Sequence, residues 1–142
     1  MRTYKSFEEY IIYHLQIAEF MSLIGFYNNM MPVGGCITTD MQLIDYGYNN
    51  YNNHIEMLLK PGDDLFVTLE PCPMCLFYIC LKKIKRVFFL YSNPNYGSCG
   101  GKLLLLPQIQ NIYKPEIFGP FSNSRSSILI TYFTQNIQRT IT

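Results

Sequence analysis

Apolar and aromatic positions near the start of the chain recur every three or four residues, from Ser6 to about Ile24. They are Phe7, Tyr10, Ile11, His14, Leu15, Ile17, Ala18 and Met21. This spacing is typical of an amphipathic helix that buries one face. Ser6 and Glu9 form a capping-box pattern at its beginning, and Gly25 is expected to end it. We therefore expect a long opening helix, with His14 on its aromatic stripe as a packed or partner-facing residue and not as a metal ligand.

Shorter apolar runs bounded by turn residues predict five strands. The runs cover residues 33–39, 41–48, 65–69, 87–91 and, as a minor strand, 117–118. The first two are expected to form a hairpin across the tight Thr39-Asp40 turn. Gly34 and Gly35 indicate that another backbone passes close to the first strand. The runs at 65–69 and 87–91 are compact and apolar, as buried strands are.

Helical segments are expected between and after these strands. The pattern predicts a short helix at 54–59 and a helix from Pro73 through Lys82 or Lys83. It also predicts a short helix over 102–113, broken near Pro107, and a final helix at 126–138. Strands that alternate with helices indicate an α/β sandwich around a mixed sheet. A length of 142 residues fits one domain, residues 1–142.

Composition narrows the possible partners and the compartment. The net charge of +1 gives no overall basic field, so nucleic-acid binding would need a local patch. Only 15% of residues are charged, and a buried oligomer interface would account for so few charges. The first ten residues lack the pattern of a signal peptide, and no apolar run is long enough to cross a membrane. We expect a soluble, cytoplasmic protein with no membrane partner.

Two short motifs carry the chemistry. His54-Ile55-Glu56 and Pro71-Cys72-Pro73-Met74-Cys75 each fall at the start of a predicted helix. A helix N-terminus favours thiolates, the form of cysteine that binds metal, and His54 can add a nitrogen ligand. Three protein ligands with an open fourth position are typical of catalytic zinc. Glu56 is not needed as a ligand and can move protons between water, a ring nitrogen and a leaving amine. The two motifs together are the pattern of zinc-dependent base deaminases, with one zinc ion per chain.

Other interpretations of these residues remain open. Cys72 and Cys75 could be a redox pair, although Pro71, Pro73 and Met74 are unlike the usual redox motif. Cys99 could close a structural zinc site as a fourth ligand. His54 and Glu56 could also be ordinary loop and surface residues. Cys36 and Cys80 are expected in the core. The basic cluster is either a solvated helix end or a site of phosphate contact, and it comprises Lys82, Lys83, Lys85 and Arg86.

Several stretches match the motifs of one enzyme family. Residues 31–35 are similar to its P-V-G-A strand, 46–49 to its G-x-N, and 67–75 to its V-T-L-E-P-C-x-M-C. Residues 86–89 and 97–100 are similar to its R-V-x-F and G-A-x-G motifs. With these residues the chain resembles the bacterial-type tRNA-specific adenosine deaminases of the cytidine deaminase superfamily.

This resemblance implies a cytidine deaminase-like three-layer α/β/α sandwich with a mixed five-stranded sheet. It implies conversion of adenosine to inosine at the wobble position of a tRNA anticodon stem-loop, by a homodimer. Asn49 would contact the base or its sugar, and the Gly35 backbone would lie against the purine. The main chain of Pro71 and Cys72 would orient the water and the departing amine, and Asn93 would lie on the substrate side.

The chain departs from the family pattern at three places. Ile55 replaces a small residue beside the site. From His54 to Cys72 is 72 − 54 = 18 positions, about ten fewer than expected for the family, so the helix and loop between them are shortened. Asn93 stands where the family commonly has aspartate, which leads to the hypothesis of weaker discrimination between RNA and DNA. Two other functions stay open: deamination of a free base, nucleoside or nucleotide such as cytosine, cytidine or guanine, and a non-catalytic zinc-binding partner subunit. Glu56 argues against the second.

Overall fold

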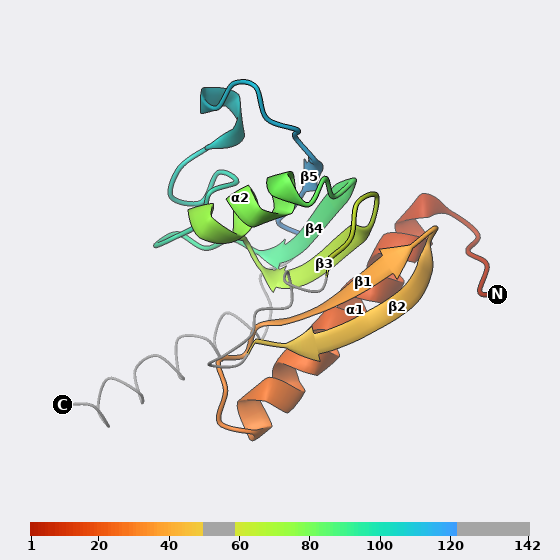
Figure 1. Ribbon diagram of the computed structural model, residues 1–142. Helices are drawn as coiled ribbons and strands as arrows, with labels where there is room; N and C mark the ends of the chain where they lie inside the picture. The colour runs from red at the N-terminus through yellow and green to blue at the C-terminus, as the bar shows by residue number, and fades with distance from the viewer. Residues whose placement is uncertain (50–58, 122–142) are drawn as a thin grey trace.

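The computed structural model describes residues 1–49 and 59–121, which form three layers around a five-stranded sheet (Figure 1). The strands are β1 (Gly34–Thr39), β2 (Gln42–Tyr48), β3 (Asp64–Leu69), β4 (Arg86–Tyr91) and β5 (Glu116–Phe118). The helices are α1 (Phe7–Tyr27), α2 (Pro73–Leu81) and a 3₁₀ turn, η2 (Leu106–Gln108). The predicted helix at 126–138, and all but the last residue of the one at 54–59, lie outside the described residues.

The sheet has the order β2-β1-β3-β4-β5. β1 runs antiparallel to β2 and β3, whereas β3, β4 and β5 are parallel. α1 lies on one face of the sheet and α2 on the other (Figure 1). The predicted three-layer α/β/α architecture with a mixed five-stranded sheet is therefore confirmed.

α1 begins as predicted and ends later than predicted. Ser6 Oγ accepts the N–H of Glu9 at 3.1 Å, while the Glu9 carboxylate accepts the N–H of Lys5 instead of closing the box on Ser6. Gly25 does not end the helix: a Cβ there would lie 3.0 Å from Tyr48, so glycine lets β2 approach. The helix ends at Tyr27, where Asn29 takes the left-handed conformation that asparagine tolerates (φ 60°).

Two apolar layers fill the space on either side of the sheet. On the α1 side, aromatic rings stack in a row across neighbouring strands: His14 on Phe66, Phe66 on Phe88, and Phe88 on Phe118, with centroids 4.6–5.0 Å apart. On the α2 side the buried residues are aliphatic apart from Phe89, and they include Ile37, Leu65, Val67, Ile79, Ile84 and Val87. Cys36 and Cys80 are buried, and His14 is fully buried, as predicted.

Two loop predictions needed correction. The hairpin between β1 and β2 turns at Asp40 and Met41, which both have positive φ, so the second strand starts one residue later than predicted. The predicted helix over 102–113 is wrong, since only the short turn η2 forms. The N–H groups of Lys102 and Leu103 bond to the Gly97 carbonyl and not along a helix, and Pro107 has no N–H to donate.

Within the described residues, no helix is both long and apolar enough to cross a lipid bilayer.

Candidate active site

Sheet topology brings most of the predicted site residues to one edge of the sheet. Because β1 is antiparallel to β3 and to β2, the start of β1, the end of β2 and the ends of β3 and β4 lie side by side. Gly35 pairs with Val67 near this edge, and Asn49 follows β2 with its N–H bonded to the Val33 carbonyl at 2.8 Å. Cys72 follows β3, and Asn93 follows β4. We refer to this as the site edge.

Cys72 and Cys75 form a close pair at the start of α2. Cys72 is the N-cap of the helix in extended conformation, and Pro73 occupies the first turn, where a missing N–H costs nothing. The two sulfurs lie 3.6 Å apart, and Cys75 is 8% exposed. Two thiolates on one tetrahedral zinc ion, each about 2.3 Å from the metal, would be about 3.8 Å apart. The pair therefore has the donor type and the spacing that zinc requires.

His54 and Glu56 lie outside the described residues, so the third predicted ligand and the predicted proton carrier stay predictions. Within the described part of the chain, no three His, Cys, Asp or Glu side chains gather as a metal site. Cys99 therefore does not form a cluster with Cys72 and Cys75, which argues against the closed four-ligand alternative. Burial raises the pKa of the Cys99 thiol to about 12, and the nearby Glu70 carboxylate adds to this.

Residues 92–101 pack against the turn that carries Cys72. Both the N–H and the hydroxyl of Ser98 donate to the Pro71 carbonyl, at 3.0 and 2.8 Å. These bonds occupy both lone pairs of that oxygen, so the Pro71 carbonyl has none left for the departing amine, contrary to the expectation from the sequence. The Asn93 side-chain oxygen accepts the N–H of Tyr96 at 3.2 Å and shapes the loop. Sequence reasoning missed Ser98, because nothing in its position along the chain links it to Pro71.

The basic cluster lies at the opposite edge of the sheet. Lys82, Lys83 and Lys85 follow the C-terminal end of α2, and a nine-residue helix places them about 13 Å from the cysteines. Arg86 has a different role from the predicted one. Its guanidinium forms a bidentate pair with Asp64, with Nε–Oδ1 and Nη2–Oδ2 distances of 2.9 and 2.6 Å. Phosphate contact by this cluster would therefore rest on the three lysines.

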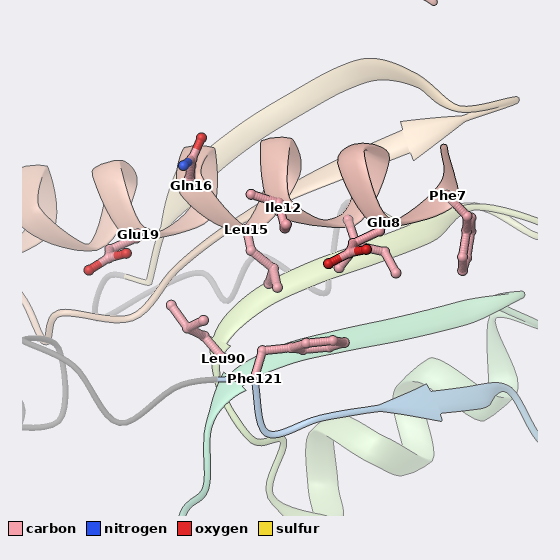
Figure 2. A pocket seen from close by; sticks show the side chains of 9 residues that line it. Phe7, Glu8, Ile12, Leu15, Gln16, Glu19, Leu90 and Phe121 are labelled. Atoms are coloured by element: carbon pink, nitrogen blue, oxygen red, sulfur yellow. The ribbon is translucent and has the colours of Figure 1, made fainter. Parts of the chain in front are cut away.

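A groove lined by described residues lies away from the site edge. It has a volume of about 570 Å³ and lies between α1 and the end of β4, with Leu15, Leu90 and Phe121 facing one another (Figure 2). Its lining is mainly apolar and includes none of the predicted site residues. The candidate active site is therefore assigned from the cysteine pair and not from the size of a cavity.

Known proteins share this fold. A solved structure from a study of A-to-I editing by tRNA:A34 deaminases at the wobble position of transfer RNA is similar, with a TM-score of 0.69. It is 22% identical, and the match covers 75% of this chain and 96% of that one. No family model matches the chain.

Curated relatives identify the family. The tRNA-specific adenosine deaminase of Rickettsia felis is 32% identical, over 81% of this chain and 94% of that protein. The enzyme of the same name from Rickettsia bellii is 28% identical, over 81% of this chain and 93% of its own length. The chain belongs to the tRNA-specific adenosine deaminases, hydrolytic enzymes of the zinc-dependent cytidine deaminase superfamily.

Proposed function

We propose that this protein hydrolyses the 6-amino group of adenosine at the wobble position of a tRNA anticodon, giving inosine and ammonia. The chain belongs to the family, and one structural observation supports the proposal. The paired thiols of Cys72 and Cys75 lie at the start of α2, on the same sheet edge as Gly35 and Asn49. A base extruded from an anticodon loop can enter such an edge without melting a duplex.

In this proposal His54, Cys72 and Cys75 hold one zinc ion per chain. When bound, the ion supplies Lewis acidity that makes water a nucleophile at neutral pH. Glu56 accepts the first proton of the attacking water and delivers it to ring nitrogen N1. It then accepts the second proton, from the hydroxyl formed at C6, and delivers it to the departing amine. The oxygen of the water becomes the 6-oxo group of inosine, ammonia leaves, and Glu56 ends the cycle in its starting state.

The substrate contacts come from the other elements at the site edge. We assign the Gly35 backbone to the purine face, Asn49 to the base or ribose, and the Cys72 main chain to the water and the amine. Asn93 stands at the start of the 92–101 loop, beside the same turn. Lys82, Lys83 and Lys85 lie at the other end of α2 from the cysteines and are the candidates for phosphate contact.

We also propose that the chain works as a homodimer through α2. Met74, Phe77 and Leu81 fall at helical positions i, i+3 and i+7 and are 67%, 41% and 72% exposed. An apolar stripe on the outer face of a helix is typical of an interface. Phe77→Glu is expected to give monomers in light scattering after size exclusion. Phe20→Glu, a matched change on α1 where Phe20 is 62% exposed, should leave the dimer intact.

The decisive test is chemical. Zinc-loaded protein is incubated with an anticodon stem-loop carrying adenosine at the wobble position, and inosine is identified by sequencing. Cytidine, cytosine and guanine are assayed alongside, and Glu56→Ala is expected to keep zinc and lose ammonia release.

A DNA hairpin of the same sequence tests the hypothesis that Asn93 weakens discrimination between RNA and DNA. Turnover of a free base with no reaction on RNA would refute the proposed substrate, and an unchanged rate in Glu56→Ala would refute the mechanism.

A further inference from the structure

Glu70 is a buried carboxylate at the site edge to which the reaction above gives no role. It stands between the end of β3 and the Pro71-Cys72 turn and is 2% exposed. Its side chain accepts four hydrogen bonds. Oε1 accepts from the Ser92 hydroxyl at 3.2 Å and the Asn93 N–H at 3.1 Å. Oε2 accepts from the N–H groups of Cys99 and Gly101 at 2.8 and 2.9 Å.

These donors come from both ends of one loop. Ser92 and Asn93 open the 92–101 segment, whereas Cys99 and Gly101 end it, so a single carboxylate joins its two ends. The glycines let the loop close around the carboxylate. A Cβ at Gly101 would lie 2.5 Å from Glu70 Oε1 and from the Asn93 carbonyl, and a Cβ at Gly97 would collide with Oε2.

The hydrogen-bond donors to the Glu70 carboxylate are all uncharged: one hydroxyl and three backbone N–H groups. Among residues 1–49 and 59–121, no lysine or arginine lies within ion-pair distance of it. A buried carboxylate is tolerated when its oxygens are fully hydrogen-bonded, and bonds to a charged acceptor are roughly twice as strong as neutral ones. An amide in its place would turn an NH₂ group toward N–H donors. The arrangement is therefore specific for a carboxylate.

We propose that Glu70 is a positioning residue that fixes the 92–101 loop, with Asn93 and the exposed Tyr96, beside the cysteine turn. The loop then meets the RNA already formed, and no free energy of binding is lost in ordering it. The part of this inference that concerns substrate rests on the proposed function. The part that concerns the loop stands on the geometry and can be measured without any substrate.

The test compares the two carboxylates that flank β3, Asp64 at its first residue and Glu70 directly after its last. Glu70→Gln is set against Asp64→Asn, the same chemical change at the other end of β3. For Glu70→Gln we expect faster hydrogen exchange at residues 92–101, unchanged zinc content, a KM for the stem-loop raised about tenfold and kcat within about threefold of wild type. Asp64→Asn should lower stability but leave KM and loop exchange unchanged. Gly101→Ala, which crowds the carboxylate from the loop side, should reproduce the Glu70→Gln pattern.

The outcomes separate the two proposals. If exchange in the loop is the same in Glu70→Gln, Gly101→Ala and wild type, the inference is overturned, whether or not the enzyme is active. A fall in kcat with KM unchanged would also overturn it. If wild type deaminates no RNA but Glu70→Gln and Gly101→Ala loosen the loop, the proposed function fails and the anchoring role of Glu70 stands. If Glu70→Gln does not fold, Gly101→Ala alone decides the question.

Discussion

The two ends of β3 each carry a buried carboxylate, and the molecule compensates them in different ways. Asp64, 3% exposed, pairs with the Arg86 guanidinium and accepts the Tyr10 hydroxyl at 2.6 Å. Glu70, at the other end, accepts from one hydroxyl and three backbone N–H groups. Side chains from α1 and β4 thus converge on Asp64, whereas main-chain groups of a loop converge on Glu70.

This difference separates stability from function. The partners of Asp64 belong to α1 and β4, so that carboxylate holds packed layers of the core together. The partners of Glu70 belong to a loop, so that carboxylate shapes the surface presented to substrate. Because all its bonded donors lie in the loop and it is almost fully buried, Glu70 does not display its charge to a polyanionic partner. Substitutions at the site edge and at the two ends of β3 should therefore have different effects on activity and on stability.

The largest effect is expected from the metal ligands. Cys75→Ser should lower kcat about a thousandfold, because the loss of one ligand removes zinc and with it the activated water. Zinc content by mass spectrometry and initial rates on the stem-loop provide the measurement. Cys80→Ser is the matched control, since Cys80 lies on the same helix and is buried in the core. Equal zinc loss in both variants would show a general effect of thiol removal.

A smaller effect, on stability alone, is expected at the opposite end of β3. Asp64→Asn leaves the partly buried Arg86 without its counter-charge and should lower the free energy of unfolding by about 3 kcal/mol. Urea denaturation measures the change. Asp40→Asn, an exposed carboxylate in the nearby hairpin, should change stability by no more than about 0.5 kcal/mol. A raised KM in Asp64→Asn would contradict the division between the two ends.

The next effect isolates one hydroxyl group of the same network. Tyr10→Phe removes the hydroxyl that donates to Asp64 and contacts Thr38, while the Arg86 pair remains. The free energy of unfolding should fall by about 1 kcal/mol, less than for Asp64→Asn, because the carboxylate keeps its cation. If urea denaturation shows equal losses for both variants, the phenol and not the ion pair holds this end of the sheet.

Much of the fold could be predicted because its signals are local. The β3 and β4 strands were found to within one residue, since strands buried on both faces are nearly continuous apolar runs. The end of α1 is predicted wrongly at Gly25, because glycine is typical of helix ends. The structure shows a tertiary role instead: the missing side chain leaves room for Tyr48 of β2. The helix expected over 102–113 failed because its N–H groups find partners in the preceding loop.

The site was predictable where its parts are neighbours along the chain. Cys72 and Cys75 are three residues apart, so a motif contains them both. Arg86 is expected from the sequence either at a solvated helix end or in contact with phosphate, because its partner, Asp64, is 22 residues away and belongs to another strand. Glu70 was matched only as a letter of a family motif, since its donors lie 22 to 31 residues further on. A carboxylate at the end of an apolar strand, followed by a glycine-rich loop, is the pattern that could have revealed it.

The smallest effect depends on pH and comes from His14, on the α1 side of the sheet. Burial lowers the pKa of its imidazole from the ordinary 6.5, and the Arg2 charge adds to this, while the bond to the Tyr10 carbonyl opposes it. The unfolded chain therefore binds this proton more readily. Stability should be constant above about pH 7 and fall as the pH drops through 6.5, by at most about 1.4 kcal/mol per pH unit.

His14→Phe, which keeps a ring against Phe66, should remove this slope in urea denaturation between pH 7 and 5.5. Any proton uptake by His54 is common to both proteins and cancels in the comparison, so equal slopes would mean that His14 is protonated as easily in the folded protein as in the unfolded chain.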